Sequence, residues 1–457
     1  MSSNQLDENR SLNGDFMGKK VAVIGGSIAG LVAAAEIHKK GHDVAIIEKG
    51  KAVGSLFNKV DTPFGLLELG MHVLYVNKQH YKHLCKIFGT QSFNVLSGTK
   101  VDIGACFNFG STSYNSAYPN VLGHSDEREI LSQIIEGKEK RERPANALEE
   151  VVCRFGKMAG KQIIAPILKK LWHMEPELLT RNAVHCFYDL RRMIVCNKGQ
   201  ADELKRDPRL DGVIGNPLQD QPSGEVFGGR MGLTLSKNCG DLTESVNDWV
   251  HRQGIEIYLN RNVALKRGCL EVDGMPVHKK YDACIIAMPM HSLASEVISS
   301  TDQLELSIYY FRLSEEIKDL FPSYYILCHD QQLKSSRIIN YDAYNTETQY
   351  NNSVLAVEVL HAVGNRPDKN VIGGEILTIL PTVTIQDSFM LERSVKVCSP
   401  SLRNAQLFDS VRSEIEGHFT GKPVYFTGMR ADAGVFFSHH TIGLAYESAV
   451  ECSRQLS

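Results

Sequence analysis

Three features are scarce or missing in this 457-residue sequence, and each absence narrows the possible functions. Its 11 cysteines are scattered singly without a CxxC pair, which argues against a metal site and is typical of reduced thiols in a cytoplasmic protein. The net charge is only −3, so we expect no nucleic-acid partner. No apolar run is long enough to span a bilayer, so the sequence predicts no transmembrane segment.

Two further absences concern the start of the chain and catalysis. Residues 1–17 are polar and have no apolar core, so they indicate a disordered tail and not a signal peptide. No G-x-S-x-G nucleophile elbow is present, which argues against a serine hydrolase of that kind. A chain of this length is too long for one simple core, so two domains are expected.

The strongest signal that is present lies near the N-terminus. Residues 21–24 are four apolar residues in a row, which predicts a strand buried on both faces. A glycine turn follows, then a helix with apolar positions within residues 31–37 and a stop near Gly41. A second strand, residues 44–47, ends on Glu48. Strand, glycine turn, helix, strand and acid in this order form the dinucleotide-binding fingerprint; the alternative is an ordinary βαβ turn without a ligand.

Each position of the turn has a physical role in binding a dinucleotide. Gly25 permits the sharp turn out of the strand, and Gly30 lets the helix pack closely on it. Ser27 replaces the usual second glycine; it is small enough to admit a pyrophosphate, and its hydroxyl is a candidate phosphate ligand. At the helix start, the N–H groups of Ile28 and Ala29 are predicted to face the phosphates, whose charge the helix dipole favours.

The acid and the residues after it extend the predicted nucleotide site. Glu48 lies about 20 residues after the turn and is expected to accept hydrogen bonds from ribose hydroxyls. The glycine-rich stretch of residues 49–58 follows directly. It contributes Lys49, Gly54 and Ser55 as candidate cofactor-binding residues.

The next segment resembles a known family. Residues 68–72 read Glu-Leu-Gly-Met-His. An acid-Leu-Gly-x-His stretch at this place is found in the amine-oxidase-like flavoproteins, which include protoporphyrinogen oxidase and UDP-galactopyranose mutase, and there it runs beside the flavin ring. The resemblance implies FAD as the cofactor and Gly70, Met71 and His72 as residues of its site.

A helical segment extends the resemblance. Residues 146–176 are similar to the helical substrate domain of the family, in which the sequence runs "VxxRFG … PxxxKxWGxxP". Asn146 and Glu149 form a predicted capping box at its start. Trp172 is expected to be a core residue, with lining of a substrate cleft as the alternative.

The middle of the chain also resembles this family. Residues 227–233 match its glycine-rich approach to the flavin, and a helix is predicted over about 235–253. The strand over 255–260 then leads to Val263, whose main chain would meet the adenine by resemblance. Residues 281–289 are another buried strand that ends in a turn and returns the chain to the nucleotide domain.

The last segment completes the predicted cofactor site. A buried strand runs over residues 423–428, and the family's strand at this place supplies backbone near the ribityl chain, here at Gly428. The final helix is predicted to open at Thr441, Ile442 and Gly443. By resemblance its N-terminus points at the pyrimidine edge of the flavin, where negative charge collects on reduction.

Residues 304–397 change to separate strands joined by polar loops, which predicts a mostly antiparallel sheet beside the substrate site. The expected strands are 307–312, 324–328, 337–340 and 354–359. Arg337 matches the arginine of a "TRxTE" stretch in the mutases, where it would fork onto a substrate carboxylate or phosphate. An exposed strand arginine without such a role is the alternative.

The sequence therefore predicts an α/β fold with two domains: a Rossmann-like FAD-binding domain with a parallel sheet, and a substrate domain of helices and a mostly antiparallel sheet. The predicted FAD-binding domain is discontinuous, comprising residues 18–110, 227–300 and 400–457; the substrate domain comprises residues 111–226 and 301–399.

Three functions follow from this resemblance. The first is an FAD-dependent oxidoreductase that takes a hydride from a small-molecule substrate. The second is a sugar-nucleotide enzyme of the UDP-galactopyranose mutase type. The spacing from Gly428 to Gly443 favours it. The mutase tyrosines are absent, however, because residues 433–440 read Ala-Gly-Val-Phe-Phe-Ser-His-His. The third is a flavin-binding protein without turnover of its own.

Two adjacent histidines are the candidate catalytic groups, together with Arg337. His439 and His440 precede the predicted final helix, where either is able to move a proton near neutral pH. The alternative is that Ser438 or Thr441 caps the helix while the histidines pack or face water.

Overall fold

A computed structural model describes most of the chain. The described residues are 18–54, 59–68, 73–95, 104–114, 116–137, 143–217, 230–235, 242–293, 299–314, 323–341, 353–392 and 394–457. The predicted tail, together with Ser55, Gly70, Met71 and His72, lies outside them. Within the described ranges, no helix is long and apolar enough to cross a bilayer.

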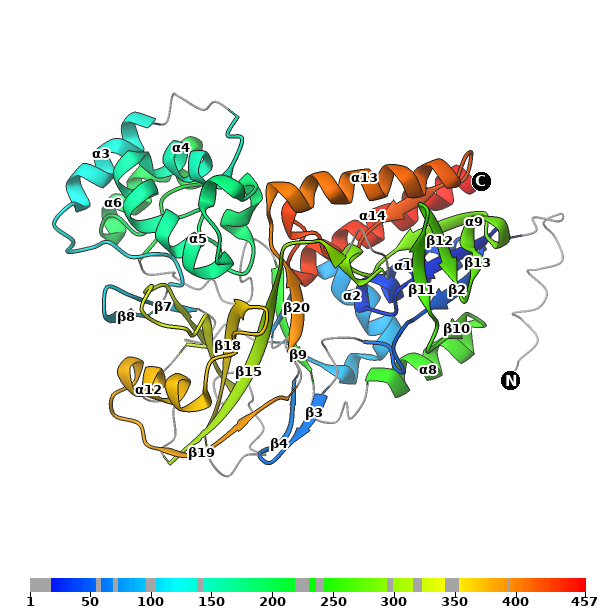
Figure 1. Cartoon of the computed structure of the whole chain (residues 1–457), viewed down its shortest axis with the longest axis horizontal. Helices are drawn as coiled ribbons and strands as arrows, with labels where there is room; N and C mark the ends of the chain where they lie inside the picture. Colours follow the sequence, from blue (N-terminus) through cyan, green and yellow to red (C-terminus); the bar gives the residue numbers. More distant parts are fainter. Residues whose placement is uncertain are drawn as a thin grey trace.

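A five-stranded parallel sheet lies on the right in Figure 1, and we call the region built around it the nucleotide domain because the sequence predicts a dinucleotide site there. Its strand order is β10-β2-β1-β14-β21, and every neighbouring pair is parallel. The strands are β1 (Lys20–Ile24), β2 (Asp43–Ile47), β10 (Glu256–Tyr258), β14 (Ala283–Ile286) and β21 (Val424–Phe426). The predicted parallel sheet is thus confirmed.

Both faces of this sheet are covered. Val21 and Val23 of β1 face a core formed with helices, whereas Ala22 and Ile24 face a second core, and all four side chains have 0% exposure. The first face carries α1 (Ile28–Lys39), α2 (Lys78–Phe88), α8 (Leu242–Gln253) and α14 (Ser438–Leu456). The second carries the meander of β11 (Val263–Lys266), β12 (Cys269–Val272) and β13 (Met275–Pro276), with α9 (Val277–Lys280) and α13 (Leu402–His418). Burial on both faces explains the unbroken apolar run in β1.

A mixed, mostly antiparallel sheet forms the second layer of the molecule, at the lower left of Figure 1. Its order is β19-β15-β18-β17-β16-β7-β8, with β20 also paired to β15, and only β16 and β7 are parallel. The strands are β7 (Ala105–Asn108), β8 (Ser111–Ser113), β15 (Gln303–Leu313), β16 (Tyr325–Cys328), β17 (Arg337–Asn340), β18 (Val354–Ala362), β19 (Ile385–Met390) and β20 (Val395–Cys398), and α12 (Lys369–Ile379) packs on β15 and β19. The sequence predicts that the first segment of the FAD-binding domain ends at residue 110. Since β7 and β8 both belong to the mixed sheet, this sheet begins before that predicted boundary.

Helices form a separate cluster above this sheet, at the upper left of Figure 1. They are α3 (Glu127–Gly137), α4 (Ala147–Ala159), a π turn (Gly160–Ile164), α5 (Ala165–Trp172), α6 (Lys198–Leu204) and α7 (Pro208–Asp211), with 3₁₀ turns at Pro176–Leu178 and Arg181–His185. The predicted capping box is present, since Asn146 Oδ1 accepts from the Glu149 N–H at 2.9 Å. The Glu149 carboxylate reaches back to the Ala145 N–H at 2.8 Å.

Smaller elements connect the layers. They are the hairpin of β3 (Lys59–Thr62) and β4 (Gly65–Glu68), the sheet β5-β9-β6 built from Leu74–Asn77, Arg230–Leu235 and Phe93–Val95, and the 3₁₀ turns Thr90–Ser92, Met290–Ser292 and Ala431–Ala433. The helix expected from about residue 235 is wrong at its start, because Leu235 ends β9 and pairs with Phe93. Strand pairing across the sheet determines this segment, which local periodicity does not reveal.

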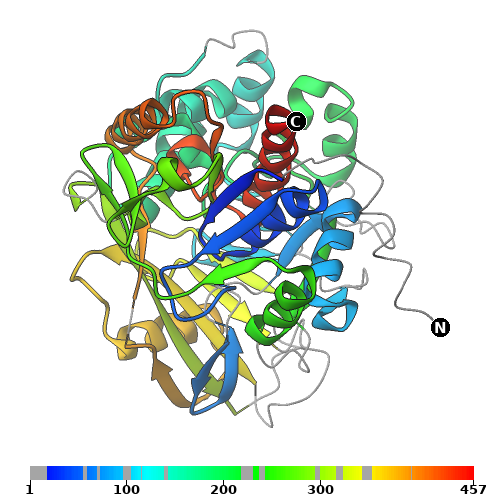
Figure 2. The same cartoon turned by 90° about the vertical axis from the view of Figure 1, so that its right-hand side faces the viewer.

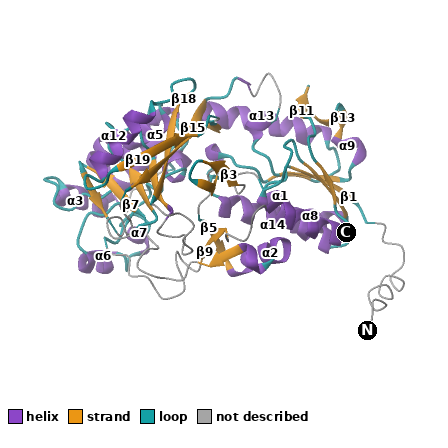
Figure 3. Ribbon diagram, turned by 90° about the horizontal axis from the view of Figure 1, so that it is seen from below, coloured by secondary structure: helices purple, strands orange, loops and turns teal. Residues whose placement is uncertain are grey.

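The views from the side and from below show how the layers meet. In Figure 2, α1 (dark blue) lies beside α14 (dark red), and the two helices share the core on one face of the parallel sheet. In Figure 3, the strands of the mixed sheet lie at the left and α1, α8 and α14 at the right. Both α1 and α14 follow strands of the parallel sheet, so both begin at its carboxyl edge.

Candidate functional site

The glycine turn after β1 has no room for side chains. Gly25 has φ = +109°, and its N–H donates to the Ile47 carbonyl at 2.7 Å. A Cβ at Gly25 would lie 2.8 Å from the Met288 nitrogen, and one at Gly30 would lie 2.0 Å from the Gly25 carbonyl oxygen. Any larger residue at Gly30 would therefore push α1 away from the turn.

The start of α1 presents unpaired donors to the carboxyl edge of the sheet. Ser27 is the N-cap: its Oγ accepts from the Gly30 N–H and donates to the Ala287 carbonyl, each at 3.4 Å. Its hydroxyl is thus engaged within the protein. The N–H groups of Ile28 and Ala29 belong to the first helical turn, which has no carbonyl acceptors in its own helix. These two groups are able to bind an anion such as a phosphate.

Glu48 follows β2, and its carboxylate binds the backbone of the glycine turn. One carboxylate oxygen accepts from the Gly26 N–H and the other from the Gly50 N–H, both at 2.6 Å. Each oxygen keeps a further lone pair that is able to accept a hydroxyl. The loop after Glu48, in which Lys49 is exposed, folds back over the turn, because the Gly54 N–H donates to the Gly26 carbonyl at 2.9 Å.

The chain after β10 runs beside this acid. The Glu48 N–H donates to the Tyr258 carbonyl at 2.8 Å, and the Arg261 N–H donates back to the Glu48 carbonyl at 3.0 Å. A third bond joins the Asn260 N–H to the Gly50 carbonyl at 2.9 Å. Val263 begins β11 two residues later and is buried. The tertiary structure therefore brings Val263 to the corner that holds Glu48.

The residues that follow β21 are packed as closely as the glycine turn. The N–H groups of Thr427 and Gly428 both donate to the Ile286 carbonyl, at 2.8 and 3.2 Å, and a Cβ at Gly428 would lie 2.0 Å from the Met288 carbonyl oxygen. The buried Thr427 hydroxyl has no hydrogen-bond partner among the described residues. The carboxyl ends of β1, β14 and β21 thus lie along one edge of the sheet. From β1, the strand order runs to β2 and β10 on one side and to β14 and β21 on the other. Ligands of open α/β sheets bind at the carboxyl edge where the strand order switches direction in this way.

The final helix begins three residues earlier than predicted. Ser438 is its first residue and Phe437 its N-cap, without a capping side chain, so His439 and His440 lie in the first turn and not before it. Thr441 Oγ1 donates to the Ser438 carbonyl at 2.9 Å inside the helix. Neither Ser438 nor Thr441 is the N-cap, so this part of the capping alternative is wrong.

Ile442 and Gly443, the other residues of α14 that the sequence assigns to the site, pack against neighbouring helices. Ile442 has 0% exposure and lies in the core shared with α1. Gly443 is half-buried, and a Cβ there would lie 3.6 Å from His80 Cε1. Hence the first turns of α14 face both α1 and the start of α2.

Aromatic rings gather at the start of α14, and we name them the aromatic cluster. It consists of Trp172, Phe187, Phe436, Phe437, His439 and His440, with ring centroids of successive neighbours 4.1 to 6.3 Å apart. His439 stacks on Phe437 with an interplanar angle of 6°. The cluster joins the helical layer to the nucleotide domain, and Trp172 is buried at 1% exposure, as expected for a core residue.

Sequence reasoning missed one member of this neighbourhood, His185. Its ring centroid lies 6.3 Å from that of His440, and a Cβ at Gly434 would lie 2.6 Å from its Nε2. Burial, with the positive charge of Arg191, lowers the pKa of His185, so its ring is neutral at pH 7. A single histidine carries no local sequence signal of such a role.

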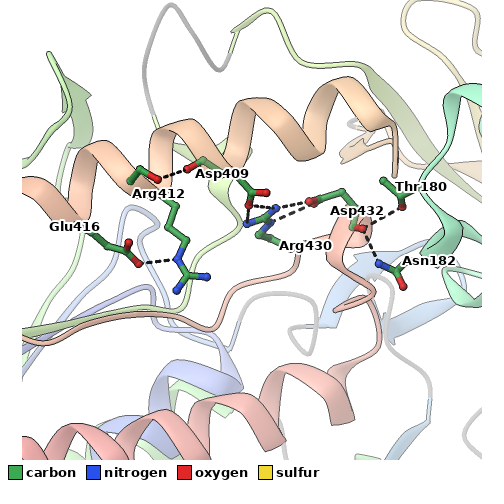
Figure 4. Close-up of polar contacts among 8 residues, drawn as sticks. Thr180, Asn182, Asp409, Arg412, Glu416, Arg430 and Asp432 are labelled. Atoms are coloured by element: carbon green, nitrogen blue, oxygen red, sulfur yellow. Dashed lines mark hydrogen bonds and ion pairs between the residues drawn. The ribbon is translucent and has the colours of Figure 1, made fainter. Parts of the chain in front are cut away.

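An ionic network, drawn in Figure 4, holds the loop that leads to the aromatic cluster. The guanidinium of Arg430 lies between the carboxylates of Asp409 on α13 and Asp432, at 3.1 Å from the former. The Asp432 carbonyl accepts from Thr180 Oγ1 at 3.0 Å and Asn182 Nδ2 at 2.9 Å. Because Arg430 and Asp432 are 11% and 2% exposed, the network fixes the loop against the helical layer.

Arg337 forms a buried ion pair and is not an exposed strand arginine. It lies opposite Glu358 in the β17–β18 register, and its Nη2 and Nε lie 2.6 and 2.9 Å from Glu358 Oε2. Glu358 is 0% exposed, whereas the arginine side chain keeps 23% exposure. The guanidinium carbon also lies 5.3 Å from the ring centre of Phe187. Arg337 therefore lies at the border of the aromatic cluster. Its ion pair with Glu358 is made by Nη2 and Nε and leaves out the two N–H groups of Nη1.

The sequence comparisons cover parts of the chain. A family model described as an NAD(P)-binding Rossmann-like domain matches residues 23–88. Over 55 residues the chain is 36% identical to an uncharacterized protein in the nifH2 3′ region of Methanothermococcus thermolithotrophicus. That match covers 12% of this chain and 53% of the relative, so the chain spans about half the length of the curated relative it matches.

Solved structures match nearly the whole chain. Reduced UDP-galactopyranose mutase has a TM-score of 0.65 at 13% identity, covering 96% of both chains. A candidate protoporphyrinogen oxidase from Exiguobacterium sp. 255-15 has 0.59 at 14% identity, covering 96% of this chain and all (100%) of that one. Cyclohexylamine oxidase from Brevibacterium oxydans IH-35A has 0.58 at 11% identity, covering 96% and 99%. These matches confirm the predicted resemblance at the level of the fold: the chain shares with these structures a parallel Rossmann-like sheet and a mixed, mostly antiparallel sheet.

Proposed function

We propose that the chain binds FAD non-covalently and oxidises a small molecule by hydride transfer to the flavin. The observation that supports this most directly is that two features follow strands of the parallel sheet at its carboxyl edge: the crowded glycine turn with Glu48 after β1 and β2, and the aromatic cluster at the start of α14 after β21. The structural neighbours include amine oxidases, and oxidation of a C–N or C–C bond is the reaction class we assign. Bound isoalloxazine supplies the electron-accepting chemistry, which side chains lack.

The residues present fit this cofactor. The N–H groups of Ile28 and Ala29 would bind the pyrophosphate, Glu48 the adenosine ribose, and the backbone at Val263 the adenine. The closely packed backbone at Gly428 and the buried Thr427 hydroxyl lie directly after β21, at the same edge of the sheet. FAD is a long molecule, and these proposed contacts come from strands near both ends of the sequence, so they can bind different parts of it.

The protein's own groups would orient and desolvate the substrate. The rings of Phe436 and Phe437 exclude water, and the start of α14 favours negative charge at the flavin edge. The buried Trp172 indole N–H, which has no hydrogen-bond partner among the described residues, would donate to a substrate acceptor. His439 or His440 would accept the substrate proton, and Nη1 of Arg337 would hold an anionic substrate group.

A sugar-nucleotide mutase is the second candidate, because UDP-galactopyranose mutase matches 96% of the chain. The residues 433–440 argue against it, since they hold no tyrosine to bind a diphosphate. Trapping experiments separate the two: net consumption of an electron acceptor identifies an oxidoreductase, whereas a redox-neutral product identifies a mutase. A flavin-binding protein without turnover would show neither.

The protein is expected to purify yellow and to release FAD on denaturation, because no cysteine or histidine lies in a recognised flavin-linkage motif. The measurement is absorbance and mass spectrometry of the supernatant after acid precipitation. A colourless supernatant above a yellow pellet would contradict non-covalent binding. Release of NAD would contradict the cofactor assignment.

Glu48→Ala is expected to weaken FAD binding by about 10- to 100-fold, since a hydrogen bond to a charged group contributes about 1.5–3 kcal/mol. Isothermal titration of the apoprotein measures this. Glu375→Ala is the matched control: Glu375 also accepts two backbone N–H groups, from Lys334 at 2.6 Å and Ser335 at 2.8 Å, but in the mixed-sheet layer. Equal FAD affinity in Glu48→Ala and the wild type would remove Glu48 from the ribose site.

A further inference from the structure

Three potential metal ligands meet on the face of the nucleotide domain that carries the β11–β13 meander. They are Cys269 at the start of β12, His278 in α9 and His418 at the end of α13. One ligand atom from each lies within 4.8 Å of the other two. Val263 and Cys269 mark opposite ends of the β11–β12 hairpin, roughly 10 Å apart at the rise of a strand, so the cluster is separate from the adenine corner.

The distance between the two best-placed atoms matches a zinc site. Cys269 Sγ lies 3.7 Å from His278 Nδ1. Tetrahedral zinc with Zn–S of about 2.3 Å and Zn–N of about 2.0–2.1 Å separates sulfur and nitrogen by about 3.6 Å. A metal ion therefore fits between these two ligands with little movement. The rings of His278 and His418 are also nearly parallel, 28° apart, with centroids at 5.7 Å.

The surroundings hold the third ligand in place and leave a side open. The Arg267 carbonyl lies 3.2 Å from His418 Nε2, a contact of the kind that orients metal-binding imidazoles. Ser413, Glu414 and Gly417 of α13 line a hollow beside His418, with Arg267 and Gly268 on the other side. A Cβ at Gly268 would lie 3.2 Å from Glu414 Oε2 and 3.4 Å from His418 Nε2, so the carboxylate is close to the third ligand.

Charges of both signs lie near the cluster: Glu271 and Glu414 are acidic, whereas Lys279 and Lys422 are basic. The Lys422 ammonium is engaged by the carbonyls of His278 and Tyr281, at 2.7 and 2.8 Å. Zinc binding requires the Cys269 thiol to lose its proton, and the bound dication itself stabilises the resulting thiolate.

We propose that Cys269, His278 and His418 bind one Zn²⁺ through a thiolate and two imidazoles, with the fourth position taken by water or Glu414. One thiolate and two imidazoles favour zinc over magnesium or calcium. Binding releases the thiol proton to solvent, and zinc remains divalent. The ion would fasten the end of α13 to the β12 hairpin and α9, which come from distant parts of the sequence, and so stabilise the nucleotide domain independently of FAD.

The test uses the full chain with its cofactor as purified, stripped with a chelator and titrated with ZnCl₂ and separately with CoCl₂. We expect one metal ion per chain, a zinc-dependent rise in Tm, and a thiolate-to-cobalt absorption band with tetrahedral d–d bands. Cys269→Ser is expected to abolish the thiolate band. His418→Gln, at an exposed helix end, is expected to weaken zinc binding by at least about 100-fold, since loss even of outer contacts costs 10- to 100-fold.

Cys153→Ser is the control, because Cys153 is a partly buried cysteine on α4, outside the cluster. It is expected to bind zinc as the wild type does. Absence of the thiolate band in the wild type, or equal zinc affinity in wild type, Cys269→Ser and His418→Gln, would overturn the proposal. The readouts are metal binding and Tm, so they stand whether or not the proposed oxidoreductase activity is found.

Discussion

Alanine at both His439 and His440 is expected to slow substrate-driven reduction of the bound flavin by about 10²–10⁴-fold while FAD stays bound, which is the usual contribution of a placed acid or base. Both rings lie in the first turn of α14, 4.1 Å apart by their centroids. His439 stacks on Phe437, and His440 lies beside the neutral ring of His185. A proton taken from the substrate therefore has acceptors at the edge of a largely apolar cluster.

Stopped-flow reduction under anaerobic conditions, across roughly pH 5 to 9, measures this effect because histidine titrates within that range. The single variants His439→Ala and His440→Ala identify which ring acts. Phe437→Leu is the matched control, since it removes the stacked ring without removing a titratable group. If the double variant keeps both the wild-type rate and the wild-type pH profile, the two histidines are packing residues.

Arg337→Ala is expected to lower the free energy of unfolding by about 3–5 kcal/mol, because it leaves the fully buried Glu358 carboxylate without its arginine. Denaturant titration followed by circular dichroism measures the loss. The double variant Arg337→Ala/Glu358→Gln is expected to recover much of it, since the charge is then gone from the interior. Arg312→Ala is the control on the same sheet: Arg312 lies over the Phe64 ring at 4.6 Å and a change of about 1 kcal/mol or less is expected.

Arg337→Lys tests the substrate role separately from stability. Lysine keeps the positive charge but has no bidentate fork, so we expect a raised KM with kcat little changed if Arg337 binds a substrate anion. A loss of stability in Arg337→Ala with an unchanged KM in Arg337→Lys would assign the arginine to the mixed sheet alone. No rescue by Glu358→Gln would contradict the buried-charge explanation.

The sequence by itself determined the nucleotide half of the fold, because its signals are local. An apolar run of four residues requires cover on both faces, and β1 has it. Gly25 and Gly30 occupy positions where a Cβ would overlap the backbone, and Glu48 follows β2 as the fingerprint requires. The capping box at Asn146 is likewise set by residues within one turn of each other.

Other features were decided only by the tertiary structure. Arg337 meets Glu358 through strand register, and His185 reaches His440 through the packing of separate layers. The start of α14 was misplaced because local capping rules favour Ser438 or Thr441, whereas the N-cap is Phe437, which has no capping side chain and packs against Phe436.

The same physical reason explains the cysteine–histidine cluster. The sequence has no CxxC pair and argued against a metal site, yet Cys269, His278 and His418 come together from β12, α9 and α13. Spacing along the chain reports only contacts within a turn or a hairpin. Pairs between distant elements depend on how the apolar faces of sheets and helices stack, and no single segment carries that information.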